Sequence, residues 1–380
     1  MKKLMIVTTV PLTLSTILKG QPKYLSKEYQ VVLCSSNSDE LEHVAEEEGG
    51  LEFHTVAMVR RISVLNDLMS LFRMLLVLSV VRPDIIHSYT PKAGLITMLA
   101  GFIFRVPVRI HTFTGLIFPT SLGIKRRVLI WIDRLICACA TVVVPEGQGV
   151  KRDLLDYKIT RKDLNVIGNG NIAGVDTKYF DKKQVQVEAR SLKRKLEIDD
   201  KTFVFCFVGR FTQDKGFYEL YQAFEMISTS ARLLLVGSQD ERLPLSKSFQ
   251  NTLNSHPRIL QVGWVDDIRP ALAISNVFVL PSYREGFPNT PLQAGSMELP
   301  SIVTDVNGCN EIIRNGSNGW IIEARSVDEL VNAMNNALSM DTHSLQAMGR
   351  ESRKQVVEKF ERYIYLPTLV RFYNSLIENL

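Results

Sequence analysis

Short apolar runs alternate with helical patterns along most of this chain of 380 residues. Such runs, rich in Val, Ile, Leu and Phe, are typical of strands buried on both faces of a parallel sheet. In the first half the expected strands are Leu4–Val10, Gln30–Ser35, Asp84–Tyr89, Val106–Phe113, Thr141–Val144 and Leu164–Gly168. The helical patterns between them are Ile62–Val81, Lys92–Arg105, Lys125–Cys139 and Gly149–Tyr157. This alternation predicts an α/β fold whose helices cover both faces of parallel sheets.

A polar stretch, Asp176–Asp200, interrupts the alternation, which then starts again. The second set of expected strands is Phe203–Val208, Arg232–Val236, Arg258–Val262, Val277–Pro281 and Ser301–Thr304. Since the chain is longer than one hydrophobic core usually supports, we expect two Rossmann-like domains, residues 1–175 and 176–360. The tail, residues 361–380, has apolar residues at helical spacing around Pro367 and is expected to pack back on the first domain as a helix.

Composition and cysteine spacing exclude several classes of protein. The chain has 22% charged residues and no low-complexity tract, which argues against disorder. Its five cysteines form no CxxC pair, so reduced thiols in a cytoplasmic protein are expected and a zinc site is not. The apolar run after Met1 is too short for a signal peptide, and Asn66, Asp67 and Arg73 argue against a membrane-spanning helix at Ile62–Val81.

Positive charge is concentrated in the first half. Residues 1–180 hold 22 Lys and Arg against 16 Asp and Glu, whereas residues 181–380 hold 23 against 24. Arg60-Arg61 and Lys125-Arg126-Arg127 each precede an apolar helical pattern, which fits the surface of an anionic membrane. A solvated charge run beside a core helix explains these residues equally well. Nucleic acid is not expected as a partner, because no basic stripe with interleaved aromatic residues is present.

Two cations follow the expected strand Phe203–Val208. Arg210 and Lys215 lie on the loop after Gly209 and just before a helical pattern that begins near Phe217. Ligands of open α/β sheets bind at the carboxyl ends of strands, and cations beside a helix N-terminus suit a diphosphate. The structural alternatives are a surface salt bridge for Arg210 and a solvated helix start for Lys215.

A second polar loop, Pro281–Thr290, follows the expected strand Val277–Pro281. A carboxylate such as that of Glu285 can accept hydrogen bonds from sugar hydroxyls, and Gly286 lets the backbone approach a ligand closely. Asn289-Thr290 then opens a short helix whose free N–H groups suit phosphate oxygens. The alternative for Glu285 is a charge that only complements the helix dipole.

Two histidines end strands of the first half. His111 and His87 can contact substrate hydroxyls from these positions, but spacing alone favours packed core histidines. The backbone of Thr114-Gly115 can bind a ligand or form a simple turn.

Taken together, these motifs resemble those of the family 4 retaining glycosyltransferases, which have the GT-B fold. The resemblance covers nearly the whole chain and is carried by Gly209-Arg210, Asp214-Lys215-Gly216, Gly263–Asp267, Val279–Ser282 and Glu285-Gly286-Phe287. The segments His87–Gly94, His111–Gly115 and Asn169–Asp176 are similar to a narrower branch. That branch adds N-acetylhexosamine to sugars linked to undecaprenyl diphosphate.

The resemblance implies a fold and a division of roles. In the GT-B fold two Rossmann-like domains face a central cleft; here the first would bind the acceptor, the second the nucleotide sugar, and the C-terminal helix would cross back to the first domain. The implied catalytic residues are Arg210, Lys215, Glu285 and His111. The implied donor-binding residues are Gly209, Gly263, Trp264, Val265, Gly286, Phe287, Asn289, Thr290 and Gln293. Candidate acceptor-binding residues are Thr13, Ser15, His87, Lys92, Thr114 and Gly115.

Two positions depart from the family pattern. Gln293 stands where the family usually has a second glutamate that binds the donor ribose, and a neutral amide should bind it less strongly. The loop after the first expected strand, Thr8–Thr16, lacks the usual glycine-rich turn, although Thr13 and Ser15 offer hydroxyl groups.

The resulting hypothesis is a retaining, metal-independent transferase with no cofactor, which moves a hexosamine-type sugar from a UDP-sugar to a polyprenyl-diphosphate-linked saccharide. It would act in the cytoplasm, peripherally attached to the inner face of the cytoplasmic membrane, in assembly of a bacterial surface polysaccharide. The alternatives are a nucleotide-sugar epimerase of the same architecture and a weakly active partner subunit. A dehydrogenase is disfavoured, because no GxGxxG motif follows a strand. The sequence makes no prediction of oligomeric state.

Overall fold

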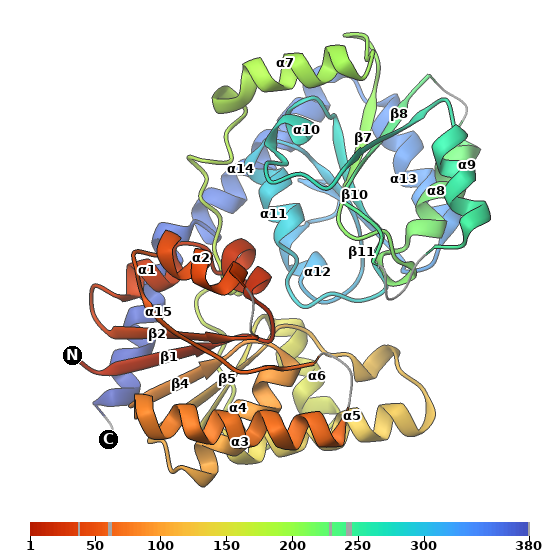
Figure 1. The fold of residues 1–380 in the computed structure, drawn as a ribbon. Coiled ribbons are helices and arrows are strands. Elements are labelled where there is room, and N and C mark those ends of the chain that lie inside the picture. The colour runs from red at the N-terminus through yellow and green to blue at the C-terminus, as the bar shows by residue number, and fades with distance from the viewer. Residues whose placement is uncertain (37–38, 60–62, 228–229, 241–244, 379–380) are drawn as a thin grey trace. The chain divides into compact units, whose positions relative to one another are not determined.

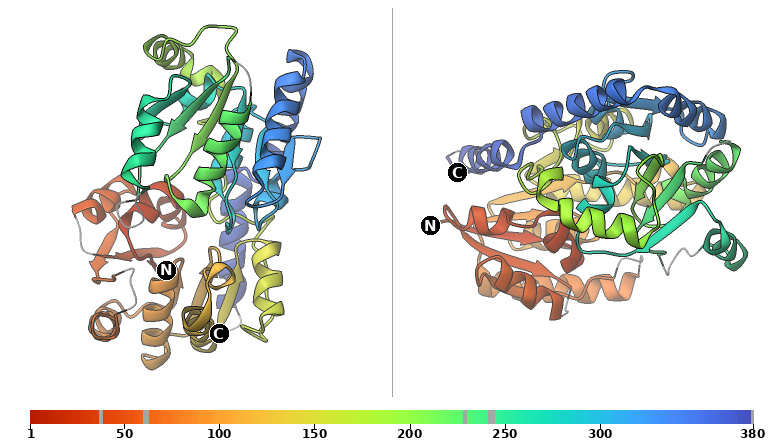
Figure 2. Two further views of the ribbon diagram at one scale, coloured as in Figure 1. Left: turned by 90° about the vertical axis from the view of Figure 1, so that its right-hand side faces the viewer. Right: turned by 90° about the horizontal axis from the view of Figure 1, so that it is seen from above.

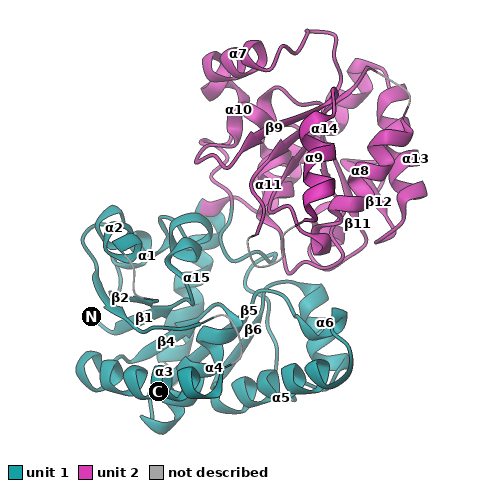
Figure 3. Cartoon of the chain, turned by 45° about the vertical axis from the view of Figure 1, so that its right-hand side comes forward, with its two compact units in different colours: residues 1–174, 363–380 teal, residues 175–362 magenta. Residues whose placement is uncertain are grey.

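The computed structural model describes residues 1–36, 39–59, 63–227, 230–240 and 245–378. The chain forms two compact units (Figure 3). Unit 1 consists of residues 1–174 and 363–380, and unit 2 of residues 175–362. Each unit has one six-stranded parallel sheet with helices on both of its faces (Figures 1 and 2). The predicted α/β class with two Rossmann-like sheets is confirmed.

The sheet of unit 1 has the strand order β3-β2-β1-β4-β5-β6. Its strands are β1 (Lys3–Val7), β2 (Gln30–Ser35), β3 (Glu52–Thr55), β4 (Ile85–Ser88), β5 (Val108–Phe113) and β6 (Val142–Pro145). Successive side chains of β1 enter different cores, because neighbours along a strand point to opposite faces. Leu4 and Ile6 join one apolar cluster, and Met5 and Val7 join the other.

Different helices cover the two faces of this sheet. The Met5 face packs against α3 (Val64–Val81), α4 (Pro91–Ile103) and α5 (Gly123–Cys139), which lie together in Figure 1. Further helices of the unit are α1 (Gln21–Leu25), α2 (Asp39–Glu47), α6 (Gln148–Asp156) and the short η1 (Thr13–Ile17) and η2 (Phe118–Thr120). The Leu4 face packs against α15 (Arg362–Ile377), whose Leu369 and Tyr373 are fully buried. The predicted return of the C-terminal helix to the first domain is therefore confirmed.

Unit 2 repeats the same topology, with the order β12-β11-β10-β7-β8-β9. Its strands are β7 (Val204–Val208), β8 (Arg232–Val236), β9 (Ile259–Gly263), β10 (Val277–Leu280), β11 (Ser301–Thr304) and β12 (Gly319–Ile322). Its helices are η3 (Lys182–Val185), α7 (Gln186–Lys195), η4 (Gln213–Lys215), α8 (Phe217–Met226), α9 (Lys247–Ser255), α10 (Arg269–Ala273), α11 (Asn289–Ser296), α12 (Cys309–Ile312), α13 (Val327–Ser339) and α14 (Thr342–Lys359). In both sheets the first and fourth strands are central neighbours, so the strand order reverses between them.

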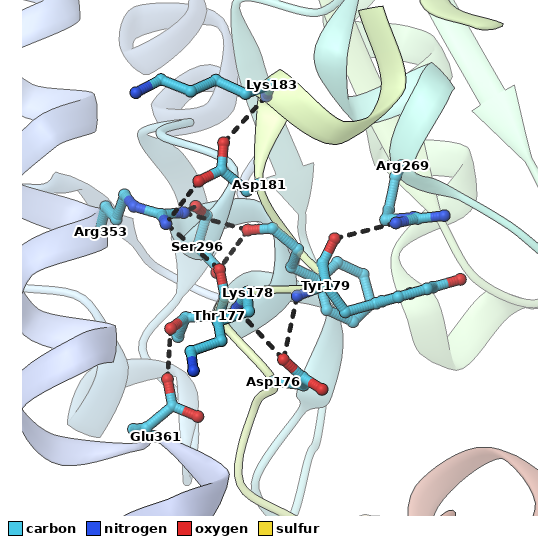
Figure 4. Close-up of polar contacts among 11 residues, drawn as sticks. Asp176, Thr177, Lys178, Tyr179, Asp181, Lys183, Arg269, Ser296, Arg353 and Glu361 are labelled. Carbon is cyan, nitrogen blue, oxygen red and sulfur yellow. Dashed lines mark hydrogen bonds and ion pairs between the residues drawn. The ribbon is translucent and has the colours of Figure 1, made fainter.

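The two ends of unit 2 are tied to each other (Figure 4). Val175 and Glu361 form a parallel bridge, and Thr177 donates a hydrogen bond to the Glu361 carboxylate. The Arg353 guanidinium binds the carbonyl oxygens of Phe180 at 3.0 Å and Thr177 at 3.2 Å, together with the Asp181 carboxylate at 3.0 Å. Because one guanidinium has five N–H donors, a single side chain can hold the whole segment.

Several expected elements differ from the structure. Leu164–Gly168 is not a strand: Leu164 and Ile167 are buried, but Gly168 is left-handed with φ 61° and the sheet ends at β6. The edge strands β3 and β12 were not predicted; β3 is polar and largely exposed, and the two middle residues of β12 are only partly buried. The polar interruption Asp176–Asp200 contains α7, whose Lys, Arg and Glu residues favour a helix. The expected helix start at Ile62 lies outside the described residues.

Asp133 of α5 is a buried acid with a pH-dependent effect on stability. Burial raises the pKa of its carboxyl group to about 7 from an ordinary value of 3.8. Below about pH 4 both folded and unfolded chains carry the proton. As the pH rises toward 7 only the unfolded chain releases it freely, so the folded state loses stability over this window.

We therefore expect Asp133→Asn to stabilise the protein at pH 8, by up to about 4 kcal/mol, and to have a smaller effect at pH 5. Denaturant unfolding at both pH values measures the difference. Equal free energies of unfolding for the two proteins at pH 8 would show that the buried carboxyl group is not destabilising.

Candidate functional site

Two loops of unit 2 meet where its strand order reverses. One carries Arg210 and Lys215, and the other carries Glu285. β7 and β10 are parallel neighbours, with Phe205 opposite Val277, so both strands end at the same edge of the sheet. The loop after β7, residues 209–216, and the loop after β10, residues 281–288, start from these ends. This edge is where ligands bind in open α/β sheets.

The backbones of the two loops are in direct contact. Tyr283 donates its backbone N–H to the Asp214 carbonyl oxygen at 2.9 Å. Gly216 is left-handed with φ 67°, and a Cβ atom there would lie 1.9 Å from the Pro281 carbonyl oxygen. Only glycine fits both the conformation and the close approach, so Gly216 fixes the distance between the loops.

Each predicted cation of the first loop holds a carboxylate. Lys215 Nζ lies 2.5 Å from Glu285 Oε1, and these side chains are 19% and 11% exposed. Arg210 Nη1 lies 2.6 Å from Asp240 Oδ2, with 52% of the arginine side chain and 6% of the aspartate side chain exposed. Lys215 is thus not a solvated helix start, whereas Arg210 forms the salt bridge that the structural alternative named. The structure brings Lys215 and Glu285 together; it places Arg210 on the same loop.

The residues after Glu285 lead into α11. Gly286 and Phe287 are buried, while Asn289, Thr290 and Gln293 of α11 are partly exposed. The helix starts at Asn289, after Pro288, without a side-chain cap, and helix starts are a common place for anions to bind.

Cys309 lies close to the Lys215–Glu285 pair. Burial, followed by the charge of Glu285, raises the pKa of the Cys309 thiol well above its ordinary value. The thiol is therefore protonated and is a poor nucleophile.

The predicted nucleobase region lies at the end of β9. Gly263 is left-handed with φ 81°, and a Cβ added there would meet no atom within 4 Å. Trp264 is 58% exposed and Val265 is partly exposed. The open space and the exposed indole leave room for a planar ring.

His111 in unit 1 is a packed histidine. It is 1% exposed, and its Nδ1 lies 2.8 Å from Ser88 Oγ. The ring lies on Gly94, where a Cβ would be 2.3 Å from His111 Cε1. Burial lowers its pKa to about 3, so the imidazole is neutral near pH 7. A neutral ring can exchange hydrogen bonds but is not a cationic acid.

His87 lies in the core of unit 1. It is fully buried, with Nδ1 2.7 Å from Tyr373 Oη and Nε2 2.7 Å from Thr112 Oγ1. Burial and then the nearby His111 lower its pKa well below the ordinary value. In this structure His87 fastens α15 to the sheet, and its predicted contact with the acceptor stays a prediction.

Internal contacts also occupy most other candidate acceptor residues. Lys92 Nζ binds both oxygens of Asp67 at 2.6 and 2.7 Å and so joins α4 to α3. Thr114 Oγ1 donates to the Tyr89 carbonyl oxygen at 3.0 Å, and Gly115 is left-handed with φ 111°. Thr13 is buried and Ser15 Oγ donates weakly to a local carbonyl at 3.3 Å.

Sequence reasoning missed polar residues that follow strand ends in both units. In unit 1, Thr9 Oγ1 and Thr90 Oγ1 lie 2.6 Å apart between the ends of β1 and β4, and Ala93 N donates to Thr9 Oγ1 at 3.2 Å. In unit 2, Asp240 follows β8 on the same edge as Arg210. A polar residue within a few positions of a strand end was the available signal in each case.

Both units match known protein families. Residues 24–170 match the model described as glycosyl transferase 4-like domain, and residues 188–355 match glycosyl transferases group 1. The capsular polysaccharide biosynthesis glycosyltransferase CapM of Staphylococcus aureus is 30% identical over 375 residues, with 95% of this chain and 94% of CapM covered.

Two further relatives carry more specific names. The UDP-Gal:alpha-D-GlcNAc-diphosphoundecaprenol alpha-1,3-galactosyltransferase of Escherichia coli is 28% identical, over 81% of this chain and 79% of its own. The N,N'-diacetylbacillosaminyl-diphospho-undecaprenol alpha-1,3-N-acetylgalactosaminyltransferase of Campylobacter jejuni is 26% identical, over 82% of both chains.

Solved structures agree with the fold. Anabaena HepE in complex with UDP-glucose superposes with a TM-score of 0.82 at 16% identity, covering 99% of this chain and 100% of HepE. A glycosyltransferase from Rickettsia africae gives a TM-score of 0.80 at 19% identity, with both chains fully covered. These likenesses confirm the predicted GT-B fold.

Proposed function

The chain belongs to the group 1 glycosyltransferases, and on that premise we propose that it transfers a hexosamine-type sugar, of the N-acetylhexosamine class, from a UDP-sugar to a polyprenyl-diphosphate-linked saccharide. The product keeps the donor's anomeric configuration, and no metal takes part. The names of the Escherichia coli and Campylobacter jejuni relatives support the lipid-linked acceptor, and the former also supports a UDP-linked donor. The name of CapM supports a place in surface polysaccharide assembly.

The observation that carries this proposal is the junction of Lys215 and Glu285 at the ends of β7 and β10. A diphosphate leaving the sugar carbon gains negative charge in the transition state, and Lys215, Arg210 and the start of α11 would stabilise it. Stabilisation by ammonium and guanidinium groups needs no metal ion.

Glu285 would orient the donor sugar. Once a diphosphate oxygen binds Lys215, the Glu285 carboxylate is free to accept hydrogen bonds from two hydroxyl groups of the sugar ring. Gln293 of α11, also partly exposed, would reach the ribose hydroxyls as a neutral donor and acceptor.

Unit 1 would bind the acceptor and lie on the membrane surface. The outer face of α3 exposes large apolar side chains, and by length and composition α3 could cross a membrane, with 22% of that stretch buried. Its Asp67 is bound by Lys92, and its Ser70 donates to the Ala57 carbonyl oxygen at 2.5 Å. These contacts hold α3 to unit 1, which favours a helix lying on the bilayer over one crossing it.

Helix α5 also exposes apolar side chains, and α4 packs against both α3 and α5. We define the apolar face as the exposed apolar side chains of α3 and α5: Val64, Leu65, Leu68, Met69, Phe72, Leu76, Val80, Ile124, Val128, Trp131 and Leu135. Lys125, Arg126 and Arg127 lie near the start of α5. Apolar side chains flanked by basic ones suit an anionic lipid surface on the cytoplasmic side.

We expect the double variant Leu65→Glu/Phe72→Glu to lose most binding to vesicles that contain anionic lipid. These side chains are 81% and 62% exposed, so the change removes apolar area and adds repulsion without disturbing the core. Vesicle flotation should show at least about a tenfold weaker partition than for the parent protein, since burying each CH₂ group contributes about 0.8 kcal/mol.

Val187→Glu/Met226→Glu is the matched control, because it places the same charges at exposed apolar positions of unit 2, 75% and 59% exposed. Equal partition of both double variants would refute a role for the apolar face.

The activity itself is tested with radiolabelled UDP-sugars and a polyprenyl-diphosphate-linked saccharide. Label that moves into the organic phase only when acceptor and protein are both present supports the proposal. Interconversion of donor sugars without acceptor would identify an epimerase, and donor binding with neither outcome would identify a partner subunit.

A further inference from the structure

Two ion pairs join the loops at the ends of β7 and β10. Asp214 and Lys215 are neighbours on the first loop, and Arg284 and Glu285 are neighbours on the second. Besides the Lys215–Glu285 pair, Arg284 Nη2 lies 3.2 Å from Asp214 Oδ2. Thus an acidic and a basic neighbour on the first loop bind a basic and an acidic neighbour on the second loop.

Asp214 lies among three cations. Its Oδ1 accepts a hydrogen bond from Thr212 Oγ1 at 2.6 Å, and Thr212 is fully buried. Burial acts to raise the pKa of Asp214, but the Thr212 hydroxyl and the charges of Arg284, Lys215 and Arg210 lower it overall. One carboxylate therefore lies within electrostatic reach of all three basic side chains.

The charges at this edge do not favour a diphosphate if only Arg210 and Lys215 are counted. Three carboxylates, those of Asp214, Asp240 and Glu285, pair with basic side chains here. Among the described ion pairs of these loops, those two cations face three carboxylates, and a diphosphate adds further negative charge. Arg284 is the cation that restores the balance.

We propose that Arg284 is a third diphosphate-binding cation of the donor site, held in place by Asp214. The proposal rests on the proposed use of a UDP-sugar and adds to it a residue outside the motifs of the resemblance. The Arg284 side chain is 35% exposed, and its ion pair with Asp214 engages one terminal nitrogen. The fork geometry of a guanidinium lets its other nitrogens bind phosphate oxygens while that contact persists.

The test compares UDP with uridine, which lacks the diphosphate, by titration calorimetry on the full chain. Arg284→Met removes the charge and keeps an unbranched side chain. We expect it to weaken UDP binding by about tenfold, as for loss of one charge-assisted hydrogen bond, and to leave uridine binding unchanged. Arg284→Lys should recover part of the UDP affinity, because it restores the charge without the fork.

Lys193→Met is the charge-matched control. Lys193 lies on α7, is 26% exposed and pairs with Asp200 at 2.7 Å, so its loss lowers the net charge of unit 2 equally. UDP affinity should not change in this variant. The proposal is overturned if Arg284→Met binds UDP as tightly as the parent, or if it loses UDP and uridine affinity equally, which would mark a purely structural role. A parent protein that binds no UDP would instead refute the proposed function.

Discussion

Lys215→Ala is expected to lower the rate of sugar transfer by about a hundredfold or more at saturating donor. The ammonium group would stabilise the charge that develops on the departing diphosphate, a contribution that is larger in the transition state than in the bound donor. The substitution also leaves the nearly buried Glu285 carboxylate, 11% exposed, without its partner at 2.5 Å. That carboxylate would then repel the incoming diphosphate.

The measurement is kcat with a UDP-sugar and a lipid-linked acceptor. Lys193→Ala, which removes a paired lysine from α7, serves as the control and should keep the parent rate. Since the loss of one ion pair can also lower stability, the thermal unfolding of Lys215→Ala is followed in parallel. A folded Lys215→Ala protein with parental turnover would exclude Lys215 from the chemistry.

Glu285→Gln is expected to separate diphosphate binding from catalysis. The amide keeps the shape of the side chain but removes the charge that holds Lys215. Lys215 is then free for phosphate oxygens, so UDP should bind as tightly as before or more tightly. Transfer should fall by about a hundredfold, because an amide orients sugar hydroxyls less strongly than a carboxylate does.

Calorimetry with UDP and the transfer assay report the two quantities independently. If Glu285→Gln lost UDP affinity and turnover in the same proportion, Glu285 would be a scaffold for Lys215 rather than a sugar ligand. Asp181→Asn provides a control, because it neutralises another partly buried carboxylate of unit 2 that pairs with an arginine, Arg353 (Figure 4). Asp181→Asn should lower thermal stability and leave UDP affinity and turnover unchanged.

Local pattern was sufficient to place Lys215 and Glu285 on loops after buried strands. It was not sufficient to pair them, since pairing depends on β7 and β10 being neighbours in the sheet. Strand order is set by how the helices pack, which no local window of sequence contains. The same reason explains why Asp240 was missed: its partner Arg210 lies on a loop from a different strand.

His87 and His111 show a second limit of prediction from sequence. Both lie within strands, His87 in β4 and His111 in β5, and their surroundings follow from which face of the sheet each enters. His87 meets Tyr373 of α15, a residue 286 positions away in sequence. His111 meets Ser88 and lies on Gly94 of α4. Spacing correctly favoured packed histidines over exposed ones, but it did not identify these partners.

Edge elements were the least predictable parts of the fold. β3 has a polar sequence, Glu52-Phe-His-Thr55, because an edge strand needs few apolar residues. Leu164 and Ile167 are apolar because each joins a core cluster of unit 1, although their segment does not pair with the edge strand β6. Apolar content reports burial, whereas a strand also needs extended backbone, and Gly168 is left-handed with φ 61°.

A crystal structure of the protein with UDP would test the central claim most directly. The account predicts that the diphosphate lies at the carboxyl ends of β7 and β10, with its oxygens within hydrogen-bond distance of Lys215 Nζ and the Arg210 guanidinium. A diphosphate bound elsewhere on the protein, with Lys215 still closed onto Glu285, would contradict it.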